Sequence, residues 1–124
     1  MRGAIVLVLL LLAGNSRRYL FADGEPPKSG RELFEIRCGG CHALDRDAEG
    51  PRLGGVYGRR AGAIKSFGYS DALKKAKITW TGESLDRWLT DPGVLAPGTD
   101  MAFRAENAEE RRLIIEYLKQ TSGK

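Results

Sequence analysis

Residues 38–42 read Cys38-Gly39-Gly40-Cys41-His42, and this stretch holds both cysteines and the only histidine of the 124-residue chain. The two thiols lie on one turn of the backbone, and the histidine follows at once. This C-x-x-C-H pattern is the signature of covalent haem attachment, in which the thiols reach the two vinyl groups of one haem. We therefore predict that Cys38 and Cys41 bind one haem c by two thioether bonds and that His42 ligates its iron.

The same cysteine pair has other possible uses. Two cysteines in an exported domain can form a disulfide, and a thioredoxin-like redox pair is expected after a strand in a βαβ unit. The residues before Cys38 are typical of a helix, which argues against the redox pair. Zinc is a weaker alternative, because the chain has no further Cys or His to complete four ligands.

The first 22 residues are typical of a segment for export. Arg2 provides a positive start, and residues 4–13 form an unbroken apolar run. A transmembrane helix needs roughly 20 residues, so this run favours a cleaved secretory signal peptide over a membrane anchor. The cleavage point stays open between Ser16 and Ala22. With cleavage after Ala22, we predict a signal peptide at 1–22, an extended lead-in at 23–28 and one domain at 29–124. We expect this domain to be exported to the periplasm without stable membrane insertion.

The charge of the whole chain is misleading, because much of its excess lies in the predicted signal peptide. The chain carries 20 Lys and Arg residues against 16 Asp and Glu. Residues 1–22 contain three of these cations and no acid, which leaves 17 against 16 in the remainder. A nearly neutral domain gives no reason to expect nucleic-acid binding. We expect a monomer whose partners are redox proteins.

A sixth iron ligand follows by elimination. The chain has no second histidine, and its two methionines are Met1 and Met101. Met1 would be lost with the signal peptide. Met101 follows Pro97 and Gly98, which can fix a loop that presents the thioether, although methionine more often fills gaps in a core. Ligation by His and Met raises the reduction potential and leaves no open site for a substrate, so we predict an electron-transfer protein and not an enzyme.

Helix start signals divide the rest of the chain into short helices. We expect helices from Ser29 into Cys38, from Ser70 to about Lys77, from Thr81 to near Asp91, and from Asn107 to a frayed end at Ser122. Residues 43–68 show neither a helical nor a strand period. A loop this long needs a large group to pack against, which a haem would supply. The predicted fold class is all-α, with about four to five helices around one haem.

From about residue 29 to 119 the chain resembles class I cytochromes c of the mitochondrial and related bacterial type. The matching blocks, besides residues 38–42, are Gly30 with Phe34, Gly50-Pro51-Arg52-Leu53, Gly58-Arg59 with Gly62, Tyr69-Ser70, Ile78-Thr79-Trp80, Pro97-Gly98-Thr99 with Met101, and Glu110-Arg111 through Tyr117-Leu118-Lys119. The resemblance implies the class I cytochrome c fold and a soluble one-haem electron carrier. It also implies that Gly30 and Phe34 pack the first helix against Ile114 and Tyr117 of the last.

The resemblance assigns further residues to the haem. The carbonyl of Pro51 would accept a hydrogen bond from the far nitrogen of His42 and so orient the ring. The side chains expected at the haem propionates are those of Arg59, Tyr69 and Trp80, with Thr99 close by.

The chain departs from the family pattern at several positions near the haem. Trp88 stands where a Tyr usually lies beside the Met sulfur, and its indole can donate a hydrogen bond but cannot accept one. Leu73 replaces a buried Asn. Asp100 replaces a Lys beside the Met, so that most of the basic ring at the haem edge is missing, although Arg37 is retained.

Three functional interpretations stay open. The first is an electron shuttle that takes an electron from a membrane complex or dehydrogenase and passes it on through an exposed haem edge. The second is a haem enzyme or sensor, such as a peroxidase or gas binder, which needs an open position on the iron. The third is a cytochrome subunit docked permanently to one oxidoreductase.

Overall fold

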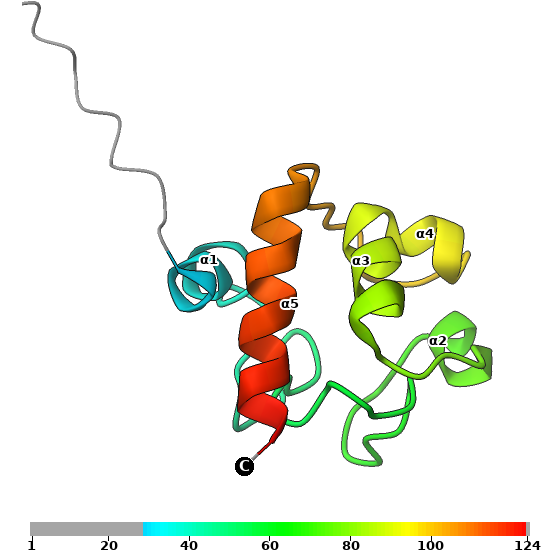
Figure 1. Ribbon diagram of the computed structural model, residues 1–124. Coiled ribbons are helices and arrows are strands. Elements are labelled where there is room, and N and C mark those ends of the chain that lie inside the picture. Colours follow the sequence, from blue (N-terminus) through cyan, green and yellow to red (C-terminus); the bar gives the residue numbers. More distant parts are fainter. Residues whose placement is uncertain (1–28, 124) are drawn as a thin grey trace, which may run out of the picture.

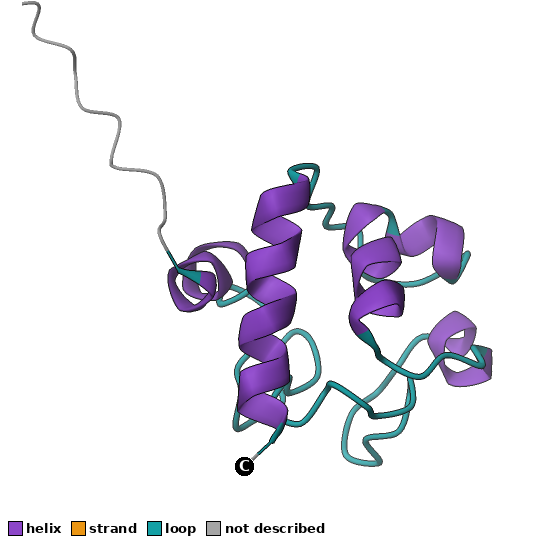
Figure 2. Ribbon diagram, in the orientation of Figure 1, coloured by secondary structure: helices purple, strands orange, loops and turns teal. Residues whose placement is uncertain are grey.

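The computed structural model describes residues 29–123, and the predicted signal peptide and lead-in at 1–28 lie outside them. The described part contains five helices and no strand (Figures 1 and 2). They are α1 (Gly30–Arg37), α2 (Asp71–Lys75), α3 (Gly82–Thr90), α4 (Pro92–Leu95) and α5 (Ala108–Ser122). This confirms the predicted all-α fold.

Side chains that the sequence predicts as N-caps begin four of these helices. Ser29, Ser70 and Thr81 each accept a hydrogen bond from the backbone N–H three residues on, and Asn107 accepts from the N–H groups of residues 109 and 110. These bonds satisfy N–H groups that have no partner within the helix. Helix α2 ends at Lys75 rather than near Lys77, and the short α4 was not predicted.

The core of the fold is the contact between the first and last helices. A Cβ added to Gly30 would lie 2.2 Å from the Leu113 carbonyl oxygen, so only glycine allows the backbones to approach this closely. Phe34 packs on Tyr117 with ring centroids 5.6 Å apart, and Ile114 is fully buried. The predicted packing of Gly30 and Phe34 against Tyr117 is therefore confirmed, and Figure 1 shows α1 nearly end-on beside α5.

The connection between α1 and α2 loops around the lower half of α5 in the view of Figure 2 and has no helical structure, as predicted for residues 43–68. Its one regular feature is an isolated antiparallel bridge between Arg60 and Thr79. Backbone bonds on either side extend this pairing, since Trp80 N–H donates to the Arg59 carbonyl at 2.9 Å and Ala61 N–H donates to that of Ile78 at 2.8 Å. The bridge therefore holds Arg59 beside Trp80.

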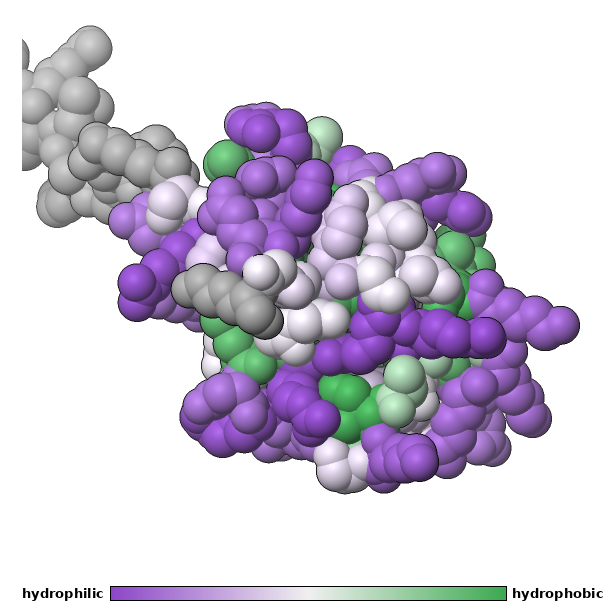
Figure 3. All heavy atoms as spheres, turned by 60° about the horizontal axis from the view of Figure 1, so that its bottom comes forward, coloured by the Kyte–Doolittle hydropathy of each residue, from purple (hydrophilic) through white to green (hydrophobic). Residues whose placement is uncertain are grey.

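Among the described residues, the large hydrophobic side chains that are exposed are Ile36 and Val94. Figure 3 shows hydrophilic side chains over most of one face, with small apolar patches between them. Among residues 29–123, no helix has the length and apolar character required to cross a membrane.

Candidate haem site

A cavity of about 370 Å³ lies between α3, α5 and the irregular connection. Its walls are mainly apolar, and the contributing residues come from almost every part of the described chain. The aliphatic side chains that line it include Leu53, Val56, Leu73, Leu85, Leu89, Ile114 and Leu118. Such walls suit a large, flat and mainly apolar group.

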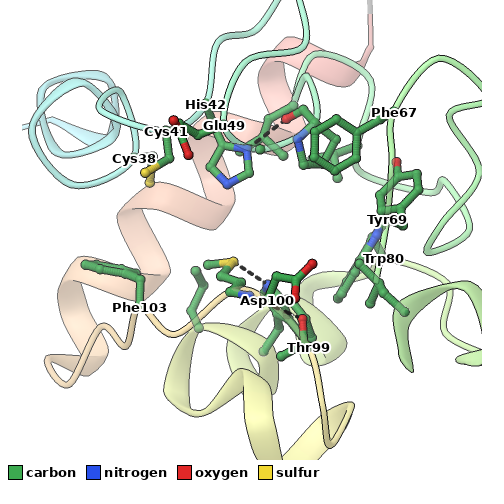
Figure 4. A pocket seen from close by; sticks show the side chains of 18 of the residues that line it. Cys38, Cys41, His42, Glu49, Phe67, Tyr69, Trp80, Thr99, Asp100 and Phe103 are labelled. Carbon is green, nitrogen blue, oxygen red and sulfur yellow. Dashed lines mark hydrogen bonds between the residues drawn. The ribbon is translucent and has the colours of Figure 1, made fainter. Parts of the chain in front are cut away.

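The C-x-x-C-H stretch forms one wall of this cavity (Figure 4). Cys38 caps the end of α1 by donating its N–H to the Phe34 carbonyl at 2.8 Å, and His42 N–H donates to the Cys38 carbonyl at 2.8 Å. This tight turn brings Cys38, Cys41 and His42 to the same opening. Cys38 is buried, whereas Cys41 is exposed at the surface.

The state of the Cys38 thiol argues against Cys38 as the nucleophile of a redox cysteine pair. Burial raises the pKa of Cys38 to about 11, which the nearby Arg37 only partly offsets. The thiol is therefore neutral at physiological pH. The nucleophile of a thioredoxin-like centre needs a lowered pKa, because the thiolate is the reactive form.

His42 is held by its outer nitrogen. Its Nδ1 lies 2.7 Å from the carbonyl oxygen of Pro51, and since that oxygen can only accept, Nδ1 carries the proton. The lone pair of Nε2 is then free on the side of the cavity, into which the imidazole points in Figure 4. Gly50 makes room for the ring, because a Cβ there would lie 2.2 Å from His42 Cε1.

Met101 lines the same cavity from the loop between α4 and α5. Figure 4 places Thr99 and Asp100 of this loop opposite His42. The Met101 N–H donates to Thr99 Oγ1 at 3.4 Å, and the indole N–H of Trp88 donates to Met101 Sδ at 3.2 Å. The Trp88 bond engages one lone pair of the sulfur and leaves the other free for a metal.

Arg59 lies at the cavity without a bonded carboxylate among the described residues. Its guanidinium donates to the carbonyl oxygens of Arg52 at 2.8 Å and Gly54 at 3.3 Å. Burial lowers the pKa of Arg59, and Asp47 offsets only part of this effect from a distance. A half-buried cation held in this way favours an anionic group in the cavity.

The other side chains predicted at the propionates also line the cavity. Tyr69 and Trp80 are buried, and the Tyr69 hydroxyl accepts a hydrogen bond from Ile64 N–H at 3.4 Å. Thr99 shapes the Met101 loop as described above. All of these predicted residues, with Arg59 and Pro51, are thus brought to one cavity.

Among the cavity residues that were not predicted are two aromatic side chains and one acid. Phe67 and Phe103 provide aromatic walls, and Glu49 lies beside His42 at the rim (Figure 4). Phe67 packs edge-on against Tyr69, with centroids 4.9 Å apart. In the sequence these aromatics stand in irregular segments without periodicity, so only the order of the matching blocks around them could have indicated their place.

The chemistry of this donor set fits a covalently attached haem. Two thiols on one turn, one imidazole nitrogen and one thioether meet across an apolar cavity, and a cation without a carboxylate partner lies at its edge. Residues 29–123 contain no cluster of three or more His, Cys, Asp or Glu that could hold a different metal ion. Fold and site together define a c-type haem protein.

Comparisons with known proteins identify the family. The family model described as Cytochrome c matches residues 27–122. Cytochrome c of Euglena viridis is 45% identical over 93 residues, which cover 73% of this chain and 91% of that protein. Cytochrome c of Gibberella zeae is 37% identical over 99 residues, 77% of this chain and 93% of that protein.

A solved structure also indicates the cytochrome c family. Cytochrome cH from Methylobacterium extorquens superposes with a TM-score of 0.69 at 39% identity, covering 73% of this chain and 94% of that one. The chain belongs to the cytochrome c family and is a class I c-type cytochrome. It is therefore a haem-containing electron carrier and not an enzyme, its cofactor is one covalently bound haem c, and it acts with redox partner proteins.

Proposed function

We propose that this cytochrome is an electron shuttle whose iron is ligated by His42 and Met101 and whose haem edge is exposed beside Cys41. The observation that carries the proposal is the placement of His42 and Met101 on one cavity, each with an atom free for a metal. A bound haem supplies a one-electron couple at its iron. With His42 and Met101 both holding the iron, the site would transfer electrons and would leave no position for a substrate.

The protein orients the two ligands and sets how strongly each would donate electrons to the iron. The Pro51 carbonyl holds the His42 ring in one tautomer and orientation. The thioether of Met101 would favour the ferrous state of a bound haem, and the hydrogen bond from Trp88 would withdraw further electron density from the sulfur. Both effects would raise the reduction potential.

The remaining side chains govern solvation and charge. The aliphatic walls exclude water from the cavity. Arg59, with Tyr69, Trp80 and Thr99, would bind the two propionates and offset the cost of holding carboxylates at the protein edge. Because Cys41 is exposed while Cys38 is buried, one attachment point lies at the surface, which supports electron transfer through that edge.

Replacement of the sixth ligand tests this assignment. Ferric Met101→Ala holoprotein should lose the red absorption band expected of a sulfur–iron bond, while the wild type keeps it. Met101→His should stay low-spin but show a lower midpoint potential, because imidazole stabilises ferric iron better than a thioether does. A wild type that lacks the band, or a Met101→Ala protein that retains it, would contradict ligation by Met101.

We also propose that the protein is exported to the periplasm, with residues 1–22 removed. The apolar run at 4–13 is typical of a signal peptide and supports this location. The C-x-x-C-H site supports it too, because haem must be attached there. Mass measurement of holoprotein isolated from the periplasmic fraction should give a chain that lacks about the first 22 residues. Recovery of the full-length chain with its haem from the cytoplasm would contradict export.

A stable complex is the alternative to a free shuttle. The largely polar face in Figure 3 favours a free monomer, whereas the nearly balanced charge of the domain leaves the docked subunit open. Size measurement of holoprotein from native extracts should give a monomer, whereas constant co-purification with one dehydrogenase would favour the docked subunit.

A further inference from the structure

One peptide group lies between His42 and an ionised side chain that the proposed function does not use. The carbonyl of Pro51 accepts from His42 Nδ1 at 2.7 Å, and the adjacent N–H of Arg52 donates to Asp47 Oδ1 at 3.0 Å. Carbonyl and N–H belong to the same planar unit. Any group that fixes the N–H therefore also fixes the direction of the carbonyl that holds His42.

Asp47 is itself held firmly in place. Its second oxygen, Oδ2, accepts from the hydroxyl of Ser66 at 2.8 Å, and the guanidinium of Arg52 lies within 3.5 Å of both oxygens. The carboxylate thus joins the loop after His42 to the segment that carries Ser66. The Arg52 N–H and the Ser66 hydroxyl, in that order, lower the pKa of Asp47, so the side chain is ionised at neutral pH.

Loop closure does not require Asp47. Three backbone bonds already join the two sides of the loop: Gly50 N–H to the Cys41 carbonyl at 2.8 Å, Leu53 N–H to that of Ala43 at 2.9 Å, and Gly54 N–H to that of Leu44 at 2.9 Å. The bond from Arg52 N–H to Asp47 is the one that acts on the peptide group bound to His42.

We propose that Asp47 is a positioning residue that strengthens the hold of Pro51 on His42 through the Pro51–Arg52 peptide group. A hydrogen bond to a carboxylate is stronger than one to a neutral acceptor, and it polarises the donor. The polarised peptide carries more negative charge on its oxygen, so the Pro51 carbonyl accepts more strongly from His42. The imidazole becomes a better donor to ferric iron. This inference rests on the proposed function, since it takes His42 as the iron ligand.

Two matched variants separate this effect from a general effect of charge. Asp47→Asn removes the charge but keeps an acceptor for the Arg52 N–H. Asp45→Asn removes a charge from the same loop, but Asp45 is exposed, and within residues 29–123 it pairs only with its neighbour Arg46. Both holoproteins are compared with the wild type by NMR of the His42 Nδ1 proton in the ferrous state and by the midpoint potential.

In Asp47→Asn we expect the His42 Nδ1 proton to exchange with solvent about five- to tenfold faster, because a charge-assisted bond is replaced by a neutral one. The midpoint potential should rise as His42 becomes a weaker donor. Asp45→Asn should leave the exchange rate unchanged and shift the potential less. Ser66→Ala, which frees Asp47 Oδ2 without removing charge, should accelerate exchange to a smaller extent and serves if Asp47→Asn does not fold.

Unchanged exchange of the His42 Nδ1 proton in both Asp47→Asn and Ser66→Ala would overturn the inference. Equal shifts of the midpoint potential in Asp47→Asn and Asp45→Asn would overturn it as well. Failure of the proposed function is recognised separately. In that case the wild type itself would lack a protected histidine ring proton and a low-spin spectrum, before any variant is compared.

Discussion

At the scale of the single residue, Arg59 and its neighbour Arg60 have opposite surroundings. Arg59 is half-buried at the cavity, whereas Arg60 is exposed. Arg59→Ala should destabilise the holoprotein by about 1.5–3 kcal/mol, the usual range for a hydrogen bond to a charged group. It should also lower the midpoint potential, because a propionate left without its cation favours ferric iron.

The two readouts for Arg59 are thermal unfolding and a redox titration, with Arg60→Ala as the matched control. Arg60→Ala should change neither the unfolding temperature nor the potential. Equal effects from the two substitutions would mean that the propionates do not lie at Arg59.

Gly50 supports a second prediction at this scale. In Gly50→Ala the new Cβ would lie 2.2 Å from His42 Cε1 and must displace the ring. We expect a loss of stability on the order of 1–3 kcal/mol and a low yield of haem-loaded protein. Gly82→Ala is the control, because Gly82 is not among the residues that line the cavity and a Cβ there makes only an ordinary 3.5 Å contact with the Tyr57 hydroxyl. Similar yields from both variants would show that His42 does not need its observed position.

The sequence predicts the chemical role of a residue better than it predicts which residues lie beside it in space. The identity of Cys38, Cys41 and His42 as an attachment motif depends only on local spacing. The juxtaposition of Arg59 with Trp80 depends on a backbone bridge between segments about twenty positions apart, and no local pattern encodes such a pairing. Family resemblance, rather than periodicity, indicated that pair.

At the scale of the elements, the contact of α1 with α5 depends on one small residue. Gly30→Ala would place a Cβ 2.2 Å from the Leu113 carbonyl oxygen and 2.9 Å from Tyr117 Cβ. Backbone cannot yield as a flexible side chain does, so α1 must move away from α5. We expect a cost of about 1–3 kcal/mol in the free energy of unfolding.

Chemical denaturation of the holoprotein measures this cost. Gly93→Ala in α4 is the control, because a Cβ there makes only an ordinary 3.4 Å contact with Asp91 Oδ1. The control should be neutral or slightly stabilising, since alanine favours helix more than glycine does. A Gly30→Ala protein as stable as the wild type would contradict the close packing of the two helices.

Element boundaries show where sequence reasoning succeeds. Capping side chains such as Ser29 and Thr81 mark helix starts, because their hydrogen bonds are local. Helix α4 was missed because four residues are too few to show a period, although Asp91 accepts from Gly93 N–H and Pro92 stands at the first helical position. Helix α2 ends two residues early because Ala76 is extended and leads into the strand-like pairing with residues 59–61.

At the scale of the whole molecule, charge is distributed unevenly. Residues 59–80 hold one acid, Asp71, and six cations: Arg59, Arg60, Lys65, Lys74, Lys75 and Lys77. The rim of the cavity differs, because Glu49 and Asp100 are exposed there and Arg37 is paired with Glu110 at 3.1 Å. The rim therefore offers little attraction to an acidic partner.

Electron transfer with an acidic partner, such as a mitochondrial-type oxidase, should accordingly be slow and only weakly dependent on salt. Asp100→Lys should raise the rate by about 10-fold at low ionic strength and make it fall steeply as salt is added. The reason is that dissolved salt screens the electrostatic attraction between the proteins beyond roughly 10 Å at 0.1 M. Stopped-flow rates across a salt series provide the measurement, and the visible spectrum should not change. A steep fall with salt in the wild type would place a basic docking face elsewhere, with residues 59–80 as its source.

The central claim is that His42 and Met101 close both axial positions of the iron, and binding of carbon monoxide tests it most directly. Ferrous wild-type holoprotein at neutral pH should show the same visible spectrum with and without carbon monoxide, whereas ferrous Met101→Ala should bind the gas rapidly. Rapid binding by the wild type would contradict the account, because it would mean an open iron and favour a sensor or peroxidase over an electron shuttle.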